Sequence, residues 1–483
     1  MSRIVPAVDE AVVARTAARC RERGIRIPTF AEMRDPSLVP EEWQARLGSV
    51  PLSAVDPVNL LRITWKNDVT TGRYGAVNAL EIPRAITGIR ARVIGLVGER
   101  FPTGAHKVGA AFGCLVPRLV TGAFDPDRHK AVWPSTGNYC RGGAFDSVIL
   151  GCVPVAVLPE NMSQERFAWL EDIGAEVIAT PGSESNVKEI YDKCWELKRD
   201  PRHVVFNQFE EFGNPLWHYH VTGPAVAEAF ADLAGPGERL AAYVSATGSA
   251  GTLAAGDYLK TVFPHVMTVA AEAQQCPTLL ENGFGEHRIE GIGDKHVPWV
   301  HHVRATDAVA AVDDEDCLRL LRLFNEPAGL AFLETLGLSA DEAASLSLLG
   351  ISGICNLLAA IKTAKAWQLT ERDVVFTIFT DSVDLYRSRL GELTAAHGEL
   401  TTEDAATAYV GSLERQQTDH FKELTQADRR AIHHLKYFTW VEQQGRSHQE
   451  LLAQWEPEYW EEIWAELGEV DRLIEAFNAR VTP

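Results

Sequence analysis

The sequence predicts an α/β fold built on a mostly parallel sheet with helices on its faces. Between about residues 90 and 380, short apolar runs alternate with segments of helical periodicity. One complete unit joins an apolar run at 153–158 to a helical segment that stops at Gly174, before a second run at 176–179. Strand–helix–strand units of this kind form parallel sheets with right-handed crossovers, and ligands bind beyond the carboxyl ends of such strands.

Other apolar runs extend the pattern, and the two ends of the chain depart from it. Further strands are predicted at 91–97, 131–133, 204–206, 241–244, 268–271 and 374–379. The first ~75 residues are instead polar and helical in character, with breaks at prolines. After Tyr386 the chain is charged and helix-rich. Its tryptophans, at 440, 455, 460 and 464, favour packing of this extension over an aromatic cage for a ligand.

Composition argues against several classes of partner. The 483 residues include 66 acidic and 46 basic side chains, a net charge of -20, which disfavours nucleic acid and anionic membranes as partners. Eight dispersed cysteines without a C-x-x-C pair predict reduced thiols rather than disulfides or a metal site. We expect no signal peptide and no membrane span, and therefore a cytoplasmic protein that acts on a small molecule.

Lys107 follows an apolar strand and opens a helix rich in small residues. The segment 102–107 reads Pro-Thr-Gly-Ala-His-Lys. A lysine at a helix start is unfavourable for the helix dipole, yet it is well placed to form a Schiff base with an aldehyde cofactor. That chemistry requires an amine that is neutral part of the time and screened from water. An ordinary lysine at a helix start is the alternative interpretation.

Two further segments place small polar residues after predicted strands. Residues 135–139, Ser-Thr-Gly-Asn-Tyr, offer clustered hydrogen-bond donors suited to a substrate carboxylate, although a helix cap is an alternative. Residues 245–252, Ser-Ala-Thr-Gly-Ser-Ala-Gly-Thr, let consecutive backbone N–H groups converge on a phosphate. Neither G-x-G-x-x-G nor a P-loop lysine is present, which disfavours a dinucleotide loop; tight strand–helix packing stays open.

Hydroxyl groups at 352 and 382 are candidates to meet a cofactor ring nitrogen. Ser352 lies in Gly-Ile-Ser-Gly at 350–353 and also has the features of a helix N-cap, while Ser382 follows Asp381. A neutral serine would leave the ring nitrogen largely unprotonated and favour eliminations from a short-lived carbanion. Asp381 would keep that nitrogen protonated instead.

Taken in order, these segments resemble the fold-type-II pyridoxal-phosphate enzymes, the group of cysteine synthase and the tryptophan synthase β-subunit. The resemblance runs from about Pro83 to Tyr386. Gly-Ala-His-Lys is most similar to the lysine segment of tryptophan synthase, and Ser135–Asn138 resembles the substrate-carboxylate loop of cysteine synthases. Further similar segments are the phosphate loop at 248–252 and the stretches at 208–209, 222–224 and 287–293.

The resemblance implies pyridoxal 5'-phosphate as cofactor, a homodimer, and two open, mostly parallel sheets with helical N- and C-terminal extensions. The expected parts are an N-terminal extension at 1–75, a catalytic core at 76–386 and a helical C-terminal extension at 387–483. Within the core, we expect a small mobile subdomain at about 108–220 and a larger cofactor-phosphate subdomain at about 221–386 plus 76–107.

Individual roles also follow from the resemblance, with Lys107 as the catalytic residue. The cofactor-binding residues would be Lys107, Asn138, Gly248, Ser249, Ala250, Gly251, Thr252, Ser352 and Ser382. The substrate-binding residues would be Ser135, Thr136, Gly137, Gln208 and Gly291.

The chain departs from cysteine synthases in the substrate pocket. Tyr139 and Cys140 stand where those enzymes carry threonine and glycine. Asp294, Lys295 and His296 follow the 291–293 stretch where small and apolar residues are usual. These three residues would either recognise a polar or charged substrate side chain or form a surface ion pair.

The implied activity is that of a lyase acting on a 3-substituted L-alanine. In this reading, Lys107 removes the α-proton, and loss of the β-substituent gives an aminoacrylate that is hydrolysed or accepts a nucleophile. Elimination and replacement share these steps, so a cysteine-synthase-like transferase is an alternative. A catalytically silent, cofactor-binding regulatory subunit is an alternative of another class, and a nucleotide-dependent oxidoreductase is a remote third.

Overall fold

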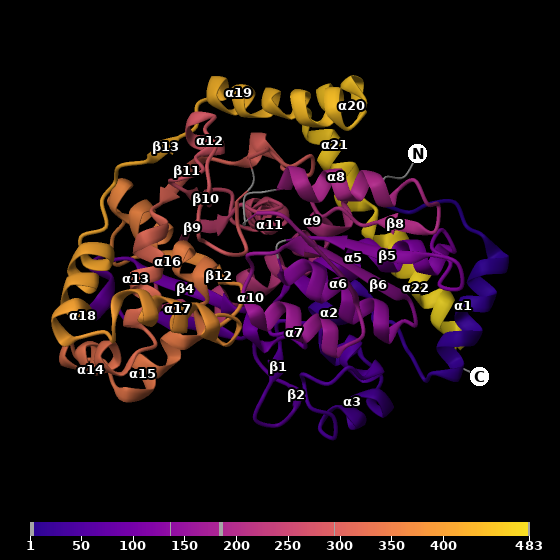
Figure 1. Ribbon diagram of the computed structural model, residues 1–483, viewed down its shortest axis with the longest axis horizontal. Coiled ribbons are helices and arrows are strands. Elements are labelled where there is room, and N and C mark those ends of the chain that lie inside the picture. Colours follow the sequence, from indigo (N-terminus) through magenta and orange to yellow (C-terminus); the bar gives the residue numbers. More distant parts are fainter. Residues whose placement is uncertain (1–3, 136, 183–186, 294, 482–483) are drawn as a thin grey trace.

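Two parallel-containing sheets form the core of the protein, and helices cover their faces (Figure 1). The computed structural model describes residues 4–135, 137–182, 187–293 and 295–481. The predicted α/β class is confirmed. Apart from the two edge strands of the larger sheet, both sheets lie within the stretch where apolar runs and helical segments alternate in the sequence.

The larger sheet has seven strands in the order β13-β11-β10-β9-β12-β4-β3. Its five inner strands run parallel, whereas the two edge strands are antiparallel to their neighbours. The inner strands are buried along most of their length, as expected for a sheet covered by helices on both faces. The strand bounds are β3 (Ala79–Ile82), β4 (Arg92–Val97), β9 (Arg239–Ala246), β10 (Met267–Ala273), β11 (Ala308–Val312), β12 (Asp373–Phe379) and β13 (Phe421–Glu423).

The smaller sheet is entirely parallel, with the order β7-β6-β5-β8. Its strands are β5 (Lys130–Pro134), β6 (Val153–Pro159), β7 (Glu176–Thr180) and β8 (His203–Val205). All four fall inside the stretch expected to form the small subdomain, although the division into subdomains stays a prediction. A separate hairpin pairs β1 (Asn67–Asp68) with β2 (Arg73–Tyr74).

Helices connect the strands and form both terminal extensions (Figure 1). Their bounds are α1 (Glu10–Glu22), α2 (Phe30–Arg34), α3 (Glu41–Leu47), α4 (Arg84–Thr87), α5 (Lys107–Thr121), α6 (Asn138–Ile149), α7 (Gln164–Asp172), α8 (Val187–Leu197), α9 (Gly213–Trp217), α10 (Gly223–Leu233), α11 (Ala254–Val262), α12 (Thr278–Glu281), α13 (Asp314–Leu323), α14 (Pro327–Thr335), α15 (Ala340–Ser345), α16 (Ile351–Ala366), α17 (Arg387–His397), α18 (Thr402–Ala408), α19 (Gln426–Lys436), α20 (His448–Ala453), α21 (Pro457–Ala465) and α22 (Leu467–Val481).

The terminal extensions pack on the core and on each other. In Figure 1 the yellow α22 runs beside the indigo α1, and Arg480 at its end pairs with Glu10 at 2.7 Å. Asp471 accepts hydrogen bonds from the N–H groups of Phe30 and Ala31. Trp440 is buried and donates its indole N–H to the Val297 carbonyl at 2.8 Å. The tryptophans at 440, 460 and 464 are packed in the protein, as expected.

All eight cysteines are buried thiols. Within the described ranges, no single helix has the length and apolar character to cross a membrane. One helix pair, Ala340–Leu348 with Ile351–Ala366, meets both criteria jointly but is bent by 110°.

Helix α5 approaches α9 so closely that glycine is required at the contact. A Cβ built on Gly113 would lie 2.3 Å from the Gly213 carbonyl oxygen, a backbone atom that cannot move alone. Gly113→Ala is therefore expected to destabilise the protein by about 2 kcal/mol through overpacking. Chemical unfolding of the two proteins measures the difference.

Gly391→Ala is the matched control, because Gly391 lies in α17 with no atom within 4 Å of the added carbon. There the higher helix propensity of alanine should leave stability unchanged or raise it by about 0.5 kcal/mol. Equal losses for both variants would contradict the proposed close approach.

Candidate active site

Lys107 begins α5 beyond the carboxyl end of β4, at the position the sequence predicted. The chain leaves β4 through a short 3₁₀ turn at Gly98–Arg100 and passes Gly104, whose φ of 70° lies in the left-handed region that favours glycine. The Lys107 amine donates to the Ser249 hydroxyl at 3.2 Å. Two segments 142 residues apart in sequence thus meet at this lysine.

The Lys107 amine is surrounded by protein atoms, although part of the residue remains accessible. This desolvation lowers its pKa from 10.5 to about 8. The adjacent His106 is fully buried, with its ring 5.4 Å from Trp65 and 5.2 Å from His218. Burial, and secondarily the Lys107 charge, hold the pKa of His106 well below its usual value. Both histidines therefore stay neutral at physiological pH and leave the lysine without a charged partner on this side.

The lowered pKa predicts how the reactivity of the amine depends on pH. Burial disfavours the ammonium form, so the reactive neutral fraction should rise with pH and reach half its maximum near pH 8. We expect the rate at which the cofactor-free protein combines with an added aldehyde to follow this curve between pH 6.5 and 9.5. The absorbance change on mixing measures the rate; a midpoint near pH 10 would contradict the desolvation of Lys107.

The predicted phosphate loop lies directly against Lys107. Ser249 accepts hydrogen bonds from the lysine and from the Asn214 amide, the latter at 3.0 Å. A Cβ on Gly251 would lie 2.0 Å from the Asn214 side chain, so the loop needs glycine there. Ala250 adopts a φ of 61°, and Thr252 accepts from the Ser245 hydroxyl at 2.8 Å. The loop is thus a tight turn that leads from the end of β9 into a short 3₁₀ helix at Gly251–Leu253, just before α11.

The predicted carboxylate loop lies between β5 and α6. The Ser135 hydroxyl accepts hydrogen bonds from the Gly137 N–H at 3.1 Å and from the Gln208 amide at 3.3 Å, so three of the predicted substrate-binding residues meet. Thr136 lies outside the described residues. The N-cap position of α6 is Gly137, which has no side chain to cap the helix, so among the described residues it is Ser135 that bonds to the Gly137 N–H.

Asn138 is the first residue of α6 and is buried. Its amide donates to Asp381 Oδ2 at 2.6 Å, while its own oxygen Oδ1 has no hydrogen-bond partner among the described residues. Asp381 therefore interacts with the side chain that was predicted to meet the cofactor.

Ser352 and Ser382 have different surroundings. Ser352 is the second residue of α16, whose N-cap is Gly350, so the N-cap interpretation of Ser352 is wrong. Its buried hydroxyl has no partner within the described part of the chain, and it lies 3.6 Å from a Cβ built on Gly291. Ser382 instead accepts the Asp384 N–H at 3.4 Å and caps the following turn. Of these two serines, only Ser352 thus has a hydroxyl without a hydrogen-bond partner among the described residues.

Gly291 and Gly248 lie on the same side of the candidate site as Ser352. A Cβ on Gly248 would lie 3.2 Å from the Gly291 carbonyl oxygen, which places the phosphate loop beside the 287–293 segment. Asp294, the first of the three polar residues that follow, lies outside the described residues. His296 has its ring 6.0 Å from that of Tyr191 on α8.

A buried polar cluster behind the carboxylate loop was not predicted from the sequence. Arg166 on α7 bonds to Glu290 and donates to the Tyr386 hydroxyl at 3.0 Å, which in turn donates to Asp381 at 2.8 Å. A Cβ on Gly137 would lie 2.2 Å from Arg166 Nε. Burial raises the pKa of Asp381, and Arg166 opposes that shift. No local sequence pattern signals this cluster, since its members come from three separate segments.

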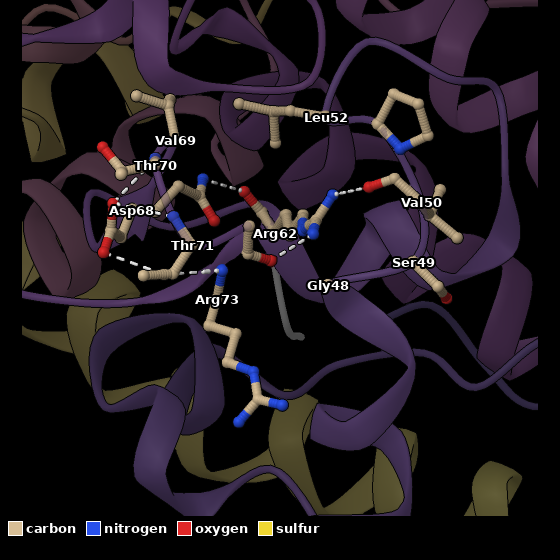
Figure 2. Close-up of a pocket in the computed structure, with 13 residues that line it drawn as sticks. Gly48, Ser49, Val50, Leu52, Arg62, Asp68, Val69, Thr70, Thr71 and Arg73 are labelled. Atoms are coloured by element: carbon tan, nitrogen blue, oxygen red, sulfur yellow. Dashed lines mark hydrogen bonds between the residues drawn. The ribbon is translucent and has the colours of Figure 1, made fainter.

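A hollow of about 330 Å³ elsewhere in the chain contains none of the predicted site residues. It lies between residues 48 and 73, and Figure 2 shows Arg62 at its centre. The Arg62 guanidinium donates to the carbonyl groups of Leu47, Val50 and Gly72. Arg62 thus stabilises this N-terminal loop through its hydrogen bonds. We assign no functional site to the hollow.

Comparison with known proteins assigns the chain to a family. The model of the family "Pyridoxal-phosphate dependent enzyme" matches residues 99–381. Cysteine synthase from Staphylococcus aureus is 30% identical over 258 residues, 53% of this chain and 75% of that protein. Cystathionine beta-synthase from Saccharomyces cerevisiae is 26% identical over 319 residues, 64% of this chain and 59% of that protein.

A solved structure shares the fold. A hydrogen sulfide-producing enzyme from Fusobacterium nucleatum superposes with a TM-score of 0.56 at 22% identity, covering 72% of this chain and 95% of that one. The predicted resemblance and the predicted cofactor are therefore confirmed. The chain belongs to the pyridoxal-phosphate-dependent enzyme family.

Proposed function

We propose that the protein is a lyase that catalyses β-elimination from a 3-substituted L-alanine, with Lys107 as its catalytic residue. The observation that carries the proposal is the buried Lys107 amine, with a pKa of about 8, held against the glycine loop at Ser249. A lysine that is partly neutral near physiological pH can act both as a nucleophile and as a general base.

The residues around Lys107 fit each functional group of pyridoxal phosphate. The amine suits the aldehyde, and the loop of Gly248, Ser249, Ala250, Gly251 and Thr252 suits the phosphate. The buried Ser352 hydroxyl, which has no partner among the described residues, would donate to the ring nitrogen, and the Asn138 Nδ2 group, which also donates to Asp381, would donate to the phenolic oxygen. An unsatisfied buried hydroxyl is costly, and a bound cofactor would satisfy Ser352.

When bound, pyridoxal phosphate supplies an electron sink for negative charge at the substrate α-carbon. We assign the ring nitrogen to Ser352, because its buried hydroxyl has no partner among the described residues and lies beside Gly291. Ser135, Thr136, Gly137, Gln208 and Gly291 would bind the substrate carboxylate and fix the α-carbon beside Lys107. The Lys107 amine would then take the α-proton, and the departing β-substituent would receive a proton as it leaves.

We also propose that the small subdomain, about 108–220, closes on the larger one during the reaction. Several polar contacts join the small subdomain to the rest of the chain. Arg166 bonds to Glu290, and Asn138 bonds to Asp381, both in the larger subdomain. Glu165 accepts from the N–H and hydroxyl of Ser388 in the C-terminal extension, at 2.7 and 2.6 Å. These contacts would hold the closed form and exclude water from the site.

A panel of 3-substituted L-alanines tests the function. The holoprotein is mixed with each amino acid, and released keto acid, ammonia and the absorbance of the cofactor are followed, with and without an added thiol. Keto acid without thiol supports elimination. A thiol adduct in its place supports the alternative, a cysteine-synthase-like transferase. A cofactor spectrum that no panel member changes would favour a catalytically silent regulatory subunit.

Two further proposals rest on the family resemblance and composition. We propose a homodimer, which light scattering of the holoprotein tests by giving a mass near twice 53.2 kDa. We also propose a cytoplasmic location, which the eight buried thiols support because a reducing compartment would keep them as they are.

A further inference from the structure

Arg141 is a buried arginine one turn into α6, three residues after Asn138. The backbone N–H of Arg141 donates to the Gly137 carbonyl at 3.0 Å, so the Arg141 backbone is bonded to the loop proposed to hold the substrate carboxylate. The residue is 4% exposed. Its guanidinium carbon lies 4.6 Å from the centre of the Trp169 ring on α7. The side chain is thus fixed between α6 and α7 and not extended into solvent.

The Arg141 guanidinium has unmet hydrogen-bonding capacity. Its Nε and Nη1 are buried and have no hydrogen-bond partner in the described part of the chain. Burial, and next the nearby Arg166 charge, lower its pKa to about 10, so it remains cationic at neutral pH. A buried cation beside another cation and without hydrogen bonds is unfavourable unless an anion joins it.

Among the described residues, the acidic groups near Arg141 do not form a hydrogen bond with it. Glu290 bonds to Arg166 and to Arg389. Asp381 Oδ2 accepts from Asn138 and Tyr386, and Asp381 Oδ1 has no hydrogen-bond partner among the described residues. Asp381 therefore attracts Arg141 electrostatically without bonding to it. The described part of the chain thus places a cationic guanidinium here without a carboxylate bonded to it.

We propose that Arg141 is a specificity-determining residue that binds a negatively charged group on the β-substituent of the amino-acid substrate. The inference rests on the proposed function and names its substrate class. The guanidinium fork matches the oxygen geometry of phosphate and carboxylate. The α-carboxylate has its own binding residues at Ser135 and Gln208, which leaves Arg141 for a second anionic group.

Two substrates that differ in the charge of the β-substituent test the proposal. O-phospho-L-serine carries an anion there, and 3-chloro-L-alanine does not. In Arg141→Met holoprotein, kcat/KM for O-phospho-L-serine should fall about 100-fold, as expected when one partner of a buried charge pair is lost. The value for 3-chloro-L-alanine should stay within about threefold. Arg141→Lys keeps the charge without the fork and should lie between the two.

Arg128→Gln is the matched control, since Arg128 is an exposed arginine in the same part of the chain. It should leave both substrates unchanged. A second measurement is independent of turnover: 50 mM sulfate should raise the thermal midpoint of the wild-type and Arg128→Gln holoproteins but not that of Arg141→Met.

The outcomes separate failure of the inference from failure of the function. Equal losses on both substrates would place Arg141 at the α-carboxylate and overturn the inference while β-elimination stands. Unchanged kcat/KM for O-phospho-L-serine in Arg141→Met would also overturn it. If wild-type holoprotein releases keto acid from 3-chloro-L-alanine but not from O-phospho-L-serine, the inference again fails alone. If neither compound reacts, the proposed function fails.

Discussion

Lys107→Ala is expected to lower kcat on the best substrate of the panel by at least about 10³-fold, because the variant lacks the proposed general base. The same change should abolish covalent attachment of the cofactor. Borohydride reduction of the wild-type holoprotein followed by peptide mass analysis should label residue 107, and the variant should carry no label. Steady-state turnover and the mass measurement together check the prediction.

Lys188→Ala is the control, because Lys188 is an exposed lysine on α8 with a side chain 74% accessible. It should retain wild-type turnover and labelling. Normal turnover in Lys107→Ala, or a label on another lysine, would contradict the assignment of Lys107 as the catalytic, cofactor-binding lysine.

Glu290→Gln is expected to destabilise the protein by about 3 kcal/mol, the usual cost of removing one member of a buried ion pair. Glu290 is 4% exposed and bonds to both Arg166 and Arg389. The amide would remove the carboxylate charge that pairs with the fully buried Arg166 guanidinium. Urea unfolding of the holoprotein measures the loss.

The matched control is Glu392→Gln, which removes a more exposed carboxylate that pairs with the same Arg389 at 2.7 Å. Exposed pairs contribute little, so a change of less than about 0.5 kcal/mol is expected. Similar effects of the two substitutions would show that the Arg166 cluster is not essential for stability.

The sequence predicts four of the five inner strands of the larger sheet, because their apolar runs are bounded by turn residues, whereas the buried inner strand β11 was not predicted. The predicted strand at 374–379 corresponds to β12, and that at 241–244 to the middle of β9. The edge strands β3 and β13 were not predicted, because they are short and half-exposed and their positions depend on pairing with β4 and β11. Such pairing is a property of the assembled sheet and not of a local pattern.

For the site, local motifs indicate which segments matter but not how they contact each other. The lysine segment and the glycine loop were identified separately, and the structure brings them together at Ser249. The cluster of Arg166, Glu290 and Tyr386 was not found, since its residues are isolated polar positions in otherwise ordinary segments. The unpartnered Arg141 likewise becomes visible only when its burial is known.

The pairing of α1 with α22 has a practical consequence for anyone who wishes to shorten this protein. Asn478 exchanges two hydrogen bonds with the backbone of Ile27, and apolar residues from both helices belong to one hydrophobic core. Deleting either terminal helix would therefore expose apolar side chains of the other helix to solvent. A shortened protein should keep both terminal helices. A circular permutant could join the two termini by a linker and place new termini elsewhere in the chain.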